Sequence, residues 1–254
     1  MAYKIAFQLY SARNFPPLER QLEGLAQIGY DGVEPWLPAY AASAADFRRK
    51  IDAAGLACYG FHLPFKDLVA EPQRFIDIAG TIGARLLIPP YLMPEDRPAT
   101  AEGWRAIGRD LQRVRDIVAG EGLKLAWHNH DFEYHALPDG SRPIDLLFEG
   151  AGADVGYEID FAWVLRGGGD PLAELKRYGE RMLAIQVKDT APLGTRQEGG
   201  WTAMGDGIVD WAALWPLFKE TPADHLVVEH DEPADWRQLA QRSYDYLVKL
   251  GARG

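Results

Sequence analysis

The segment Leu123-Lys124-Leu125-Ala126-Trp127 runs directly into His128-Asn129-His130-Asp131-Phe132-Glu133, so an apolar run meets a cluster of ionisable side chains. The first part is typical of a buried strand, and the second places two imidazoles and two carboxylates at its carboxyl end. Buried polar groups are costly unless a metal ion or a substrate satisfies them. The alternative is a polar loop with one hydrogen-bonded core histidine, and the other strand ends distinguish the two interpretations.

Short apolar runs alternate with longer helical patterns along the whole chain. The expected strands cover 5–9, 31–34, 56–61, 85–88, 123–127, 155–159, 183–187 and 226–228. The expected helices cover 17–28, 43–54, 72–82, 101–119, 143–150, 170–178, 210–220 and 235–250. Strands that alternate with helices indicate parallel βαβ units. Eight such units in 254 residues predict an α/β fold of the (β/α)₈ TIM-barrel type, with one domain over 1–254.

A doubly wound open sheet is the alternative architecture for the same alternation of strands and helices. No Gly-x-Gly-x-x-Gly motif follows the first expected strand, so the sequence lacks the usual signature of dinucleotide binding. The barrel is therefore the preferred prediction.

The composition is that of a soluble globular protein, with 47% hydrophobic and 25% charged residues. A net charge of −10 and the lack of a Lys/Arg cluster argue against nucleic-acid binding through a basic patch. The single cysteine, Cys58, excludes an intramolecular disulfide and favours a cytoplasmic location. No run approaches the length of a membrane span, and no signal-peptide pattern opens the chain. We expect a small-molecule carbohydrate partner, with homo-oligomer formation left open.

In a TIM barrel the carboxyl ends of all strands meet on one face, where the active site lies. The chain places a set of polar residues at or just past those ends: Glu34, His62, His128, His130, Glu133, Asp160, Gln186, Lys188 and Glu229. The turns expected at the opposite face, such as 29–31 and 83–85, look like plain connectors. This asymmetry between the two faces predicts an enzyme.

Three of these residues, Glu133, Asp160 and Glu229, are carboxylates that follow the fifth, sixth and eighth expected strands. Carboxylates that converge on one point repel one another unless a cation neutralises them. Gln186 follows the seventh strand, and its amide oxygen would complete an oxygen-only ligand set. Such a set suits Mg²⁺ or Mn²⁺ better than structural zinc.

Several motifs together resemble the xylose-isomerase-like sugar isomerases and epimerases, which share a TIM barrel with DNA-repair enzymes of the endonuclease IV type. The resemblance rests on Gly-Tyr-Asp-Gly-Val-Glu at 29–34, His-Asn-His-Asp-Phe-Glu at 128–133, Glu-Ile-Asp-Phe-Ala-Trp at 158–163, Gly-Gly-Asp-Pro at 168–171, Val-Lys-Asp at 187–189, Gly-Asp-Gly-Ile-Val-Asp at 205–210 and Val-Glu-His-Asp at 228–231. It covers essentially the whole chain.

The resemblance implies a metal site formed by Glu133, Asp160, the residue at 186 and Glu229. Most family members have His where this chain has Gln186, although some, including 3-dehydroshikimate dehydratases, use Gln as a ligand. The resemblance therefore implies a divalent ion, with Mn²⁺ or Mg²⁺ expected first and Co²⁺ or Zn²⁺ as alternatives.

The family's common chemistry is proton abstraction next to a carbonyl group. With Glu133 and Glu229 as the acid/base pair, the resemblance implies an isomerase or epimerase of a sugar, keto-sugar or cyclitol. The alternative is a lyase or dehydratase of the keto-sugar, inosose or 3-dehydroshikimate type, and a metal-free sugar-binding module comes third. The residues expected to bind substrate are Glu34, His62, His128, His130, Lys188 and Trp163.

Overall fold

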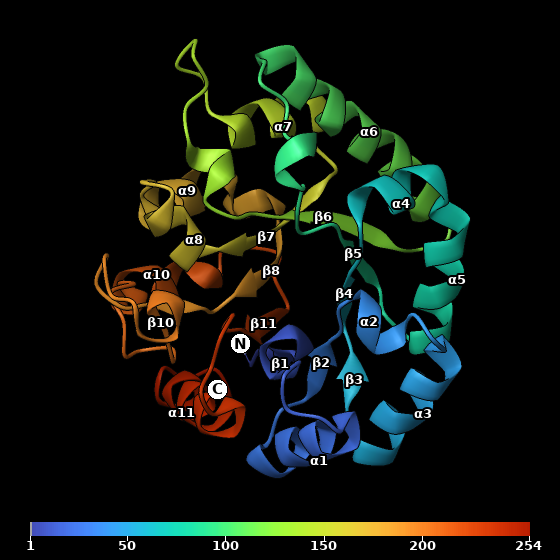
Figure 1. The fold of residues 1–254 in the computed structure, drawn as a ribbon, viewed down its shortest axis with the longest axis vertical. Coiled ribbons are helices and arrows are strands. Elements are labelled where there is room, and N and C mark those ends of the chain that lie inside the picture. The colour runs from blue at the N-terminus through green and yellow to red at the C-terminus, as the bar shows by residue number, and fades with distance from the viewer. Residues whose placement is uncertain (1) are drawn as a thin grey trace.

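The computed structural model describes residues 2–254, and most of its strand segments form one parallel sheet. The strands of this sheet are β1 (Lys4–Gln8), β2 (Gly32–Glu34), β3 (Ala57–Cys58), β4 (Gly60–His62), β5 (Leu86–Ile88), β6 (Lys124–His128), β7 (Gly156–Asp160), β8 (Met182–Gln186) and β11 (His225–Val228). Their order is β3-β2-β1-β11-β8-β7-β6-β5-β4. Figure 1 shows the strands around a common centre, with the helices outside them.

The segments at the two ends of this order, β3 and β4, are separated in the chain only by Tyr59. β3 pairs with β2, where Gly32 lies opposite Ala57, and β4 pairs with β5, where Gly60 lies opposite Leu86. One extended stretch therefore joins both edges of the sheet and nearly closes it into a barrel. The predicted (β/α)₈ TIM barrel is confirmed, and the third expected strand is present but divides where it changes partner.

The helices follow the strands at the positions that the sequence predicts, with ends that differ by only a few residues. The larger ones are α1 (Leu18–Ile28), α3 (Ala44–Ala54), α5 (Pro72–Ile82), α6 (Ala101–Ala119), α7 (Pro143–Ala151), α9 (Pro171–Tyr178), α10 (Trp211–Phe218) and α11 (Trp236–Lys249). Ser43 caps α3 through a hydrogen bond from the Asp46 N–H at 3.1 Å, and Gly55 ends it in a left-handed conformation.

Shorter helices lie between the strands and the main helices and were not expected from the sequence. They are α2 (Leu37–Tyr40), α4 (Phe65–Ala70) and α8 (Phe161–Arg166), together with 3₁₀ segments at Leu9–Ala12, Pro94–Asp96, Phe132–Tyr134, Gly179–Arg181 and Gln197–Gly200. Most of these segments follow a strand closely, so they shape the carboxyl end of the barrel. Within residues 2–254, no helix combines the length and apolar character needed to cross a membrane.

Helices α6 and α7 approach each other backbone to backbone on the outer wall. A Cβ atom added at Gly108 would lie 2.1 Å from the carbonyl oxygen of Leu147, and one at Gly150 would lie 2.2 Å from that of Arg105. Only glycine fits such an approach without moving a helix. Because α7 leads directly into β7, this contact also fixes the position of that strand.

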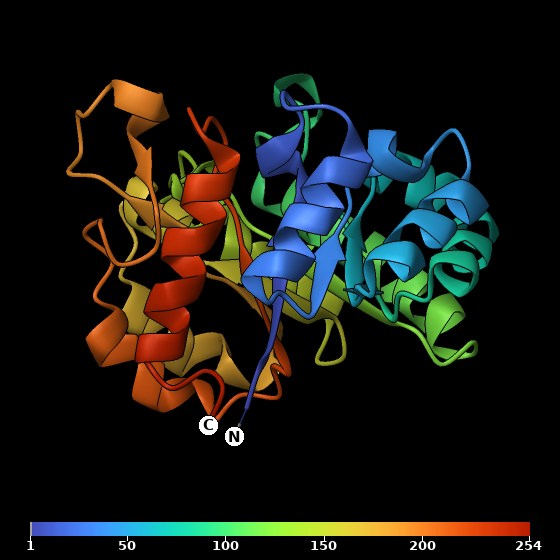
Figure 2. The same cartoon turned by 90° about the horizontal axis from the view of Figure 1, so that it is seen from below.

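The long loop after β8 contains a small hairpin of β9 (Asp189–Thr190) and β10 (Trp201–Thr202). Figure 2 shows this loop, in orange, at the end of the barrel opposite the marked N and C ends. The Asp189 carboxylate accepts hydrogen bonds from the Gly205 N–H at 2.9 Å and from Trp211 Nε1 at 2.8 Å. The second half of the loop is therefore fastened to the barrel, with the intervening turn above the strand ends.

Candidate metal centre

Three ionisable side chains from three strand ends converge inside the mouth of the barrel. His128 ends β6, Asp160 ends β7 and Glu229 follows β11, and one potential ligand atom of each lies within 4.8 Å of the others. All three residues are buried. Asp160 and Glu229 are two of the residues that the resemblance implies as ligands, whereas His128 was expected to bind substrate.

Gln186 lies beside this cluster, because it ends β8 in register with Asp160 on the neighbouring strand. Its Nε2 donates to Glu158 Oε1 at 3.3 Å, so its Oε1 points elsewhere and has no partner although it is buried. Asp160 Oδ1 accepts from the Trp163 N–H at 3.0 Å, while its Oδ2 is buried without a hydrogen-bond donor.

Buried oxygens normally have a hydrogen-bond donor or a cation as partner. In this cluster they are joined by an imidazole and a second carboxylate, so the donor set is one nitrogen and several oxygens. That set fits a divalent metal ion, which would also offset the repulsion between Asp160 and Glu229. The residues present therefore fit a divalent metal ion, as the family resemblance implies.

Glu133 is the expected ligand that the structure does not bring into this cluster. Its Oε1 accepts from Trp127 Nε1 at 3.0 Å and its Oε2 accepts from the His130 N–H at 2.9 Å. The chain turns back after His130 into the 3₁₀ segment Phe132–Tyr134, so one carboxylate oxygen accepts from the turn and the other from a side chain of the preceding strand. Burial raises the pKa of Glu133 to about 8, although these donors lower it.

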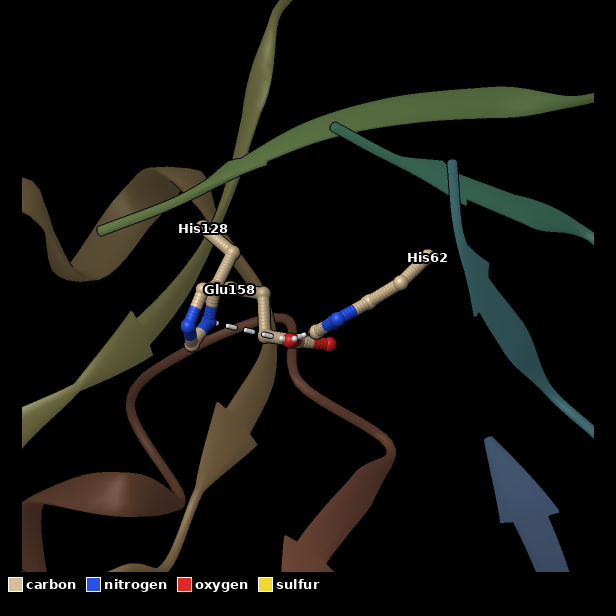
Figure 3. A group of neighbouring side chains, drawn as sticks. All are labelled: His62, His128 and Glu158. Atoms are coloured by element: carbon tan, nitrogen blue, oxygen red, sulfur yellow. Dashed lines mark hydrogen bonds and ion pairs between the residues drawn. The ribbon is translucent and has the colours of Figure 1, made fainter. Parts of the chain in front are cut away.

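Glu158 is central to the site, although its place in the sequence did not predict a role for it. It lies in β7 two residues before Asp160, so both side chains leave the strand on the same face. Its Oε1 lies 3.0 Å from His62 Nε2 and 3.2 Å from His128 Nδ1, as Figure 3 shows, and also accepts from Gln186 Nε2. One carboxylate oxygen therefore holds Gln186 by a hydrogen bond and places a negative charge against His128, whose Nδ1 has no hydrogen-bond partner.

His62 lies between two carboxylates. Its Nε2 is also 3.0 Å from Glu34 Oε1, and Glu34 in turn accepts from Gln8 Nε2 at 2.8 Å. Burial lowers the pKa of His62, but Glu34 and Glu158 together raise it to about 10. His62 is therefore positively charged at neutral pH, and Glu34 stabilises that charge as its ion-pair partner.

Lys188 supplies a second positive charge beside the cluster and is completely buried. Its Nζ lies 2.7 Å from Asp231 Oδ2, 3.4 Å from Glu229 Oε2 and 4.0 Å from Asp160 Oδ2. Burial lowers the pKa of Lys188, but these carboxylates outweigh it and the net shift is upward. Burial raises the pKa of Asp160 to about 8, and the neighbouring ammonium only partly offsets this.

A cavity of about 1000 Å³ opens onto the cluster. The predicted substrate-binding residues His62, His128, His130 and Trp163 line it, together with Glu229. The His130 ring lies 5.0 Å from the Trp163 ring, and burial holds the pKa of His130 well below its ordinary value. Glu34 and Lys188 lie behind the residues that line the cavity.

Curated proteins similar to this chain include a catabolism protein and a dehydratase. The rhizopine catabolism protein MocC of Rhizobium meliloti is 27% identical, over 93% of this chain and 82% of the relative. An inosose dehydratase of Lacticaseibacillus casei is 22% identical, over 84% of this chain and 82% of the relative.

Solved structures share the same fold at low sequence identity. A sugar phosphate isomerase/epimerase from Parabacteroides distasonis superposes with a TM-score of 0.83 at 19% identity, covering 100% of this chain and 96% of the other. The IOLI protein with a bound zinc atom gives 0.78 at 19% identity, covering 97% of each chain. A xylose isomerase-like TIM barrel protein from Mycobacterium smegmatis in complex with magnesium gives 0.75 at 16% identity, covering 99% and 98%.

The family model for xylose isomerase-like TIM barrels matches residues 22–250, which is nearly the whole chain. The nearly closed barrel and the polar residues at its strand ends agree with that match. This chain belongs to the xylose isomerase-like TIM barrel family.

Proposed function

We propose that this protein is a metal-dependent enzyme that removes a proton next to the carbonyl group of a sugar or cyclitol ketone. The observation that carries the proposal is the convergence of His128, Asp160 and Glu229 beside the unpartnered oxygens of Asp160 and Gln186. We assign these four residues as the metal ligands, with His128 in the place expected for Glu133. Oxygen donors favour Mn²⁺ or Mg²⁺, and the imidazole also admits Zn²⁺ or Co²⁺.

A divalent ion bound at this site would supply Lewis-acid polarisation of the substrate carbonyl. The residues around it would then stabilise charge and move protons. Glu229 lines the cavity and lies 3.4 Å from Lys188, so it is our candidate proton acceptor. The fixed ammonium of Lys188 would stabilise the negative charge that develops on the substrate as the proton leaves.

The geometry favours elimination over epimerisation. Epimerisation by two bases needs a second carboxylate on the opposite face of the substrate, and Glu133, the residue expected for that role, is engaged within its own turn. His62, in contrast, lines the cavity and is protonated at neutral pH. In elimination, Glu229 takes the proton from carbon, a carbon–carbon double bond forms, and the β-hydroxyl leaves as water with a proton from His62.

A dehydratase acting on a sugar or cyclitol ketone is therefore the function that we put first. The similarity to an inosose dehydratase supports this choice. An isomerase or epimerase is the second candidate, because His130 lines the cavity as a neutral imidazole and offers a possible second base. The similarity to a sugar phosphate isomerase/epimerase supports that alternative at the level of fold.

Metal content and substrate turnover test the proposal together. We expect about one divalent ion for each wild-type chain and loss of that ion in Glu229→Gln, with retention in Glu174→Gln as a control. Glu174 is equally buried, but its Oε1 accepts from Arg142 Nη1 at 2.8 Å and it lies outside the cluster. A wild-type protein that binds no Mn²⁺, Mg²⁺, Zn²⁺ or Co²⁺ would contradict the metal site.

The metal-loaded enzyme should then be incubated with inosose and a panel of keto-sugars in D₂O. Ultraviolet absorbance of an unsaturated product, with loss of water by mass spectrometry, is the result expected for elimination. Deuterium incorporation into a recovered epimer or isomer would instead favour the second candidate. No exchange and no product with any compound would count against both.

A further inference from the structure

The cavity has two chemically different halves. Its volume of about 1000 Å³ lies at the upper end of the usual range for small-molecule sites, which is roughly 300–1,000 Å³. The half beside the metal centre is lined from β6, β7 and β11 and their following loops. The other half, which we call the apolar half, is lined by side chains from the loops after β1, β2, β4 and β5: Tyr10, Trp36, Leu37, Phe65, Tyr91 and Met93.

Two large apolar side chains of the apolar half are exposed to solvent. Tyr91 is 39% exposed and Met93 is 52% exposed, although both are large apolar side chains. The rings of Tyr10 and Trp36 meet edge to face at 5.2 Å and form a second wall. Apolar and aromatic side chains that line one cavity favour binding of an apolar group, and aromatic side chains bind ring systems well.

The charges around the cavity argue against a phosphorylated substrate. Besides the protonated His62, which lies between Glu34 and Glu158, the cationic residues that line it in the described chain are Arg13 and Lys66. Arg13 donates to the Tyr10 carbonyl at 2.9 Å and packs over the Tyr10 ring, while Lys66 is paired with Asp96. The other ionisable lining includes several carboxylates, among them Asp231. Away from the proposed metal ion, a phosphate group would meet repulsion from these carboxylates and no cationic side chain without a partner in this lining.

We propose that the substrate is an uncharged sugar or cyclitol derivative that carries a second, apolar ring, as an aryl glycoside does. The polar ring faces the metal centre, and the apolar ring lies between Trp36 and Tyr91 in the apolar half. The role of the polar ring rests on the proposed function, whereas binding of the apolar ring rests on the second half of the cavity alone.

Matched pairs of glycosides test this inference. Dissociation constants are measured by calorimetry on the metal-loaded protein for nitrophenyl and methyl β-glucopyranosides, for the corresponding galactoside and mannoside pairs, and for glucose phosphate. We expect the nitrophenyl member of at least one pair to bind tenfold or more tightly than its methyl partner, which corresponds to about 1.4 kcal/mol. Glucose phosphate should bind no more tightly than methyl glucoside.

Variants locate the effect within the cavity. Trp36→Ala and Tyr91→Ala should each reduce the ratio of the two affinities towards one. Leu193→Ala removes an apolar side chain that is 69% exposed and lies outside the lining, so it should leave the ratio unchanged.

Three results would overturn the inference: ratios near one in every pair, tighter binding of glucose phosphate, or no binding by any aryl glycoside at millimolar concentration. Its failure is distinguishable from failure of the proposed function. A protein without metal contradicts the proposed function, yet the ratios can still be measured on it because the apolar half contains none of the assigned ligands.

Discussion

Replacement of Glu158 by glutamine should weaken metal binding without removing any of the proposed ligands. Glu158 Oε1 lies 3.2 Å from His128 Nδ1 and accepts a hydrogen bond from Gln186 Nε2 at 3.3 Å, so one negative charge lies against both groups. Nδ1 makes no hydrogen bond, but the negative charge of the carboxylate beside it favours the tautomer with the proton on Nδ1, which leaves the lone pair of the other nitrogen for the metal. While the carboxylate accepts from the amide nitrogen, the oxygen of Gln186 is held away from Glu158 and stays without a partner.

The size of the effect follows from this double role. Loss of one outer partner of a metal ligand typically reduces affinity by about 10–100-fold. Because Glu158→Gln affects two proposed ligands at once, we expect a change near 100-fold, or about 2.7 kcal/mol. Dissociation constants for Mn²⁺ and Zn²⁺, measured by competition with a fluorescent chelator, would give this quantity directly.

Glu174→Gln is the matched control, since it also neutralises a buried carboxylate but one that pairs with Arg142. It should lower the melting temperature and leave the metal dissociation constant unchanged. An unchanged dissociation constant in Glu158→Gln, or equal shifts in both variants, would refute the reasoning. Melting temperatures measured without metal would separate loss of fold from loss of affinity.

Four further predictions concern single groups in and around the site. Above pH 8, where the Glu133 carboxylate is ionised, Glu133→Gln places an amide N–H against a donor, either Trp127 Nε1 or the His130 N–H. It should therefore reduce the free energy of unfolding by about 1–3 kcal/mol in urea denaturation at about pH 9 and leave metal content intact; loss of the metal would contradict this. Gln186→His supplies a softer donor and should shift preference from Mn²⁺ towards Zn²⁺ in the chelator assay, whereas an unchanged preference would argue against Gln186 as a ligand. Folding raises the pKa of His62 from 6.5 to about 10, so the stabilisation from its protonated form is complete below pH 6.5 and is lost as the pH rises towards 10. The difference in the free energy of unfolding between wild type and His62→Gln should therefore become smaller over that range. A difference that does not depend on pH would count against this reasoning. Removal of bound metal with a chelator should lower the melting temperature, because an ion at 100 times its dissociation constant stabilises the folded state by about 2.7 kcal/mol. Re-addition of the metal should restore the melting temperature.

The fold could be predicted from the sequence because local signals agree with the tertiary arrangement. Gly29, Gly55 and Gly83 each end a helix in a left-handed conformation, and apolar runs after them form strands. The division of the third strand at Tyr59 could not be predicted, since both halves carry the same apolar pattern. Which neighbour each half pairs with depends on closure of the barrel.

The strand ends that meet at the cluster could be predicted from the sequence, but not all of the side chains that lie together there. Asp160 and Glu229 lie where the strand ends placed them, and Gln186 lies beside them. Sequence spacing did not reveal that the chain turns back after His130, which takes Glu133 away from the cluster and leaves His128 in it. The alternation of residues in β7 did contain the signal for Glu158, because it lies two positions before Asp160.

The glycine contact between α6 and α7 has a consequence for how this protein tolerates mutation. A methyl group at Gly108 or Gly150 would overlap backbone atoms of the facing helix, and α7 would have to move outwards. That displacement would be transmitted to β7, which carries both Glu158 and Asp160. A genetic screen for inactive variants should therefore recover alanine substitutions at these two outer-wall glycines, although neither contacts the cavity.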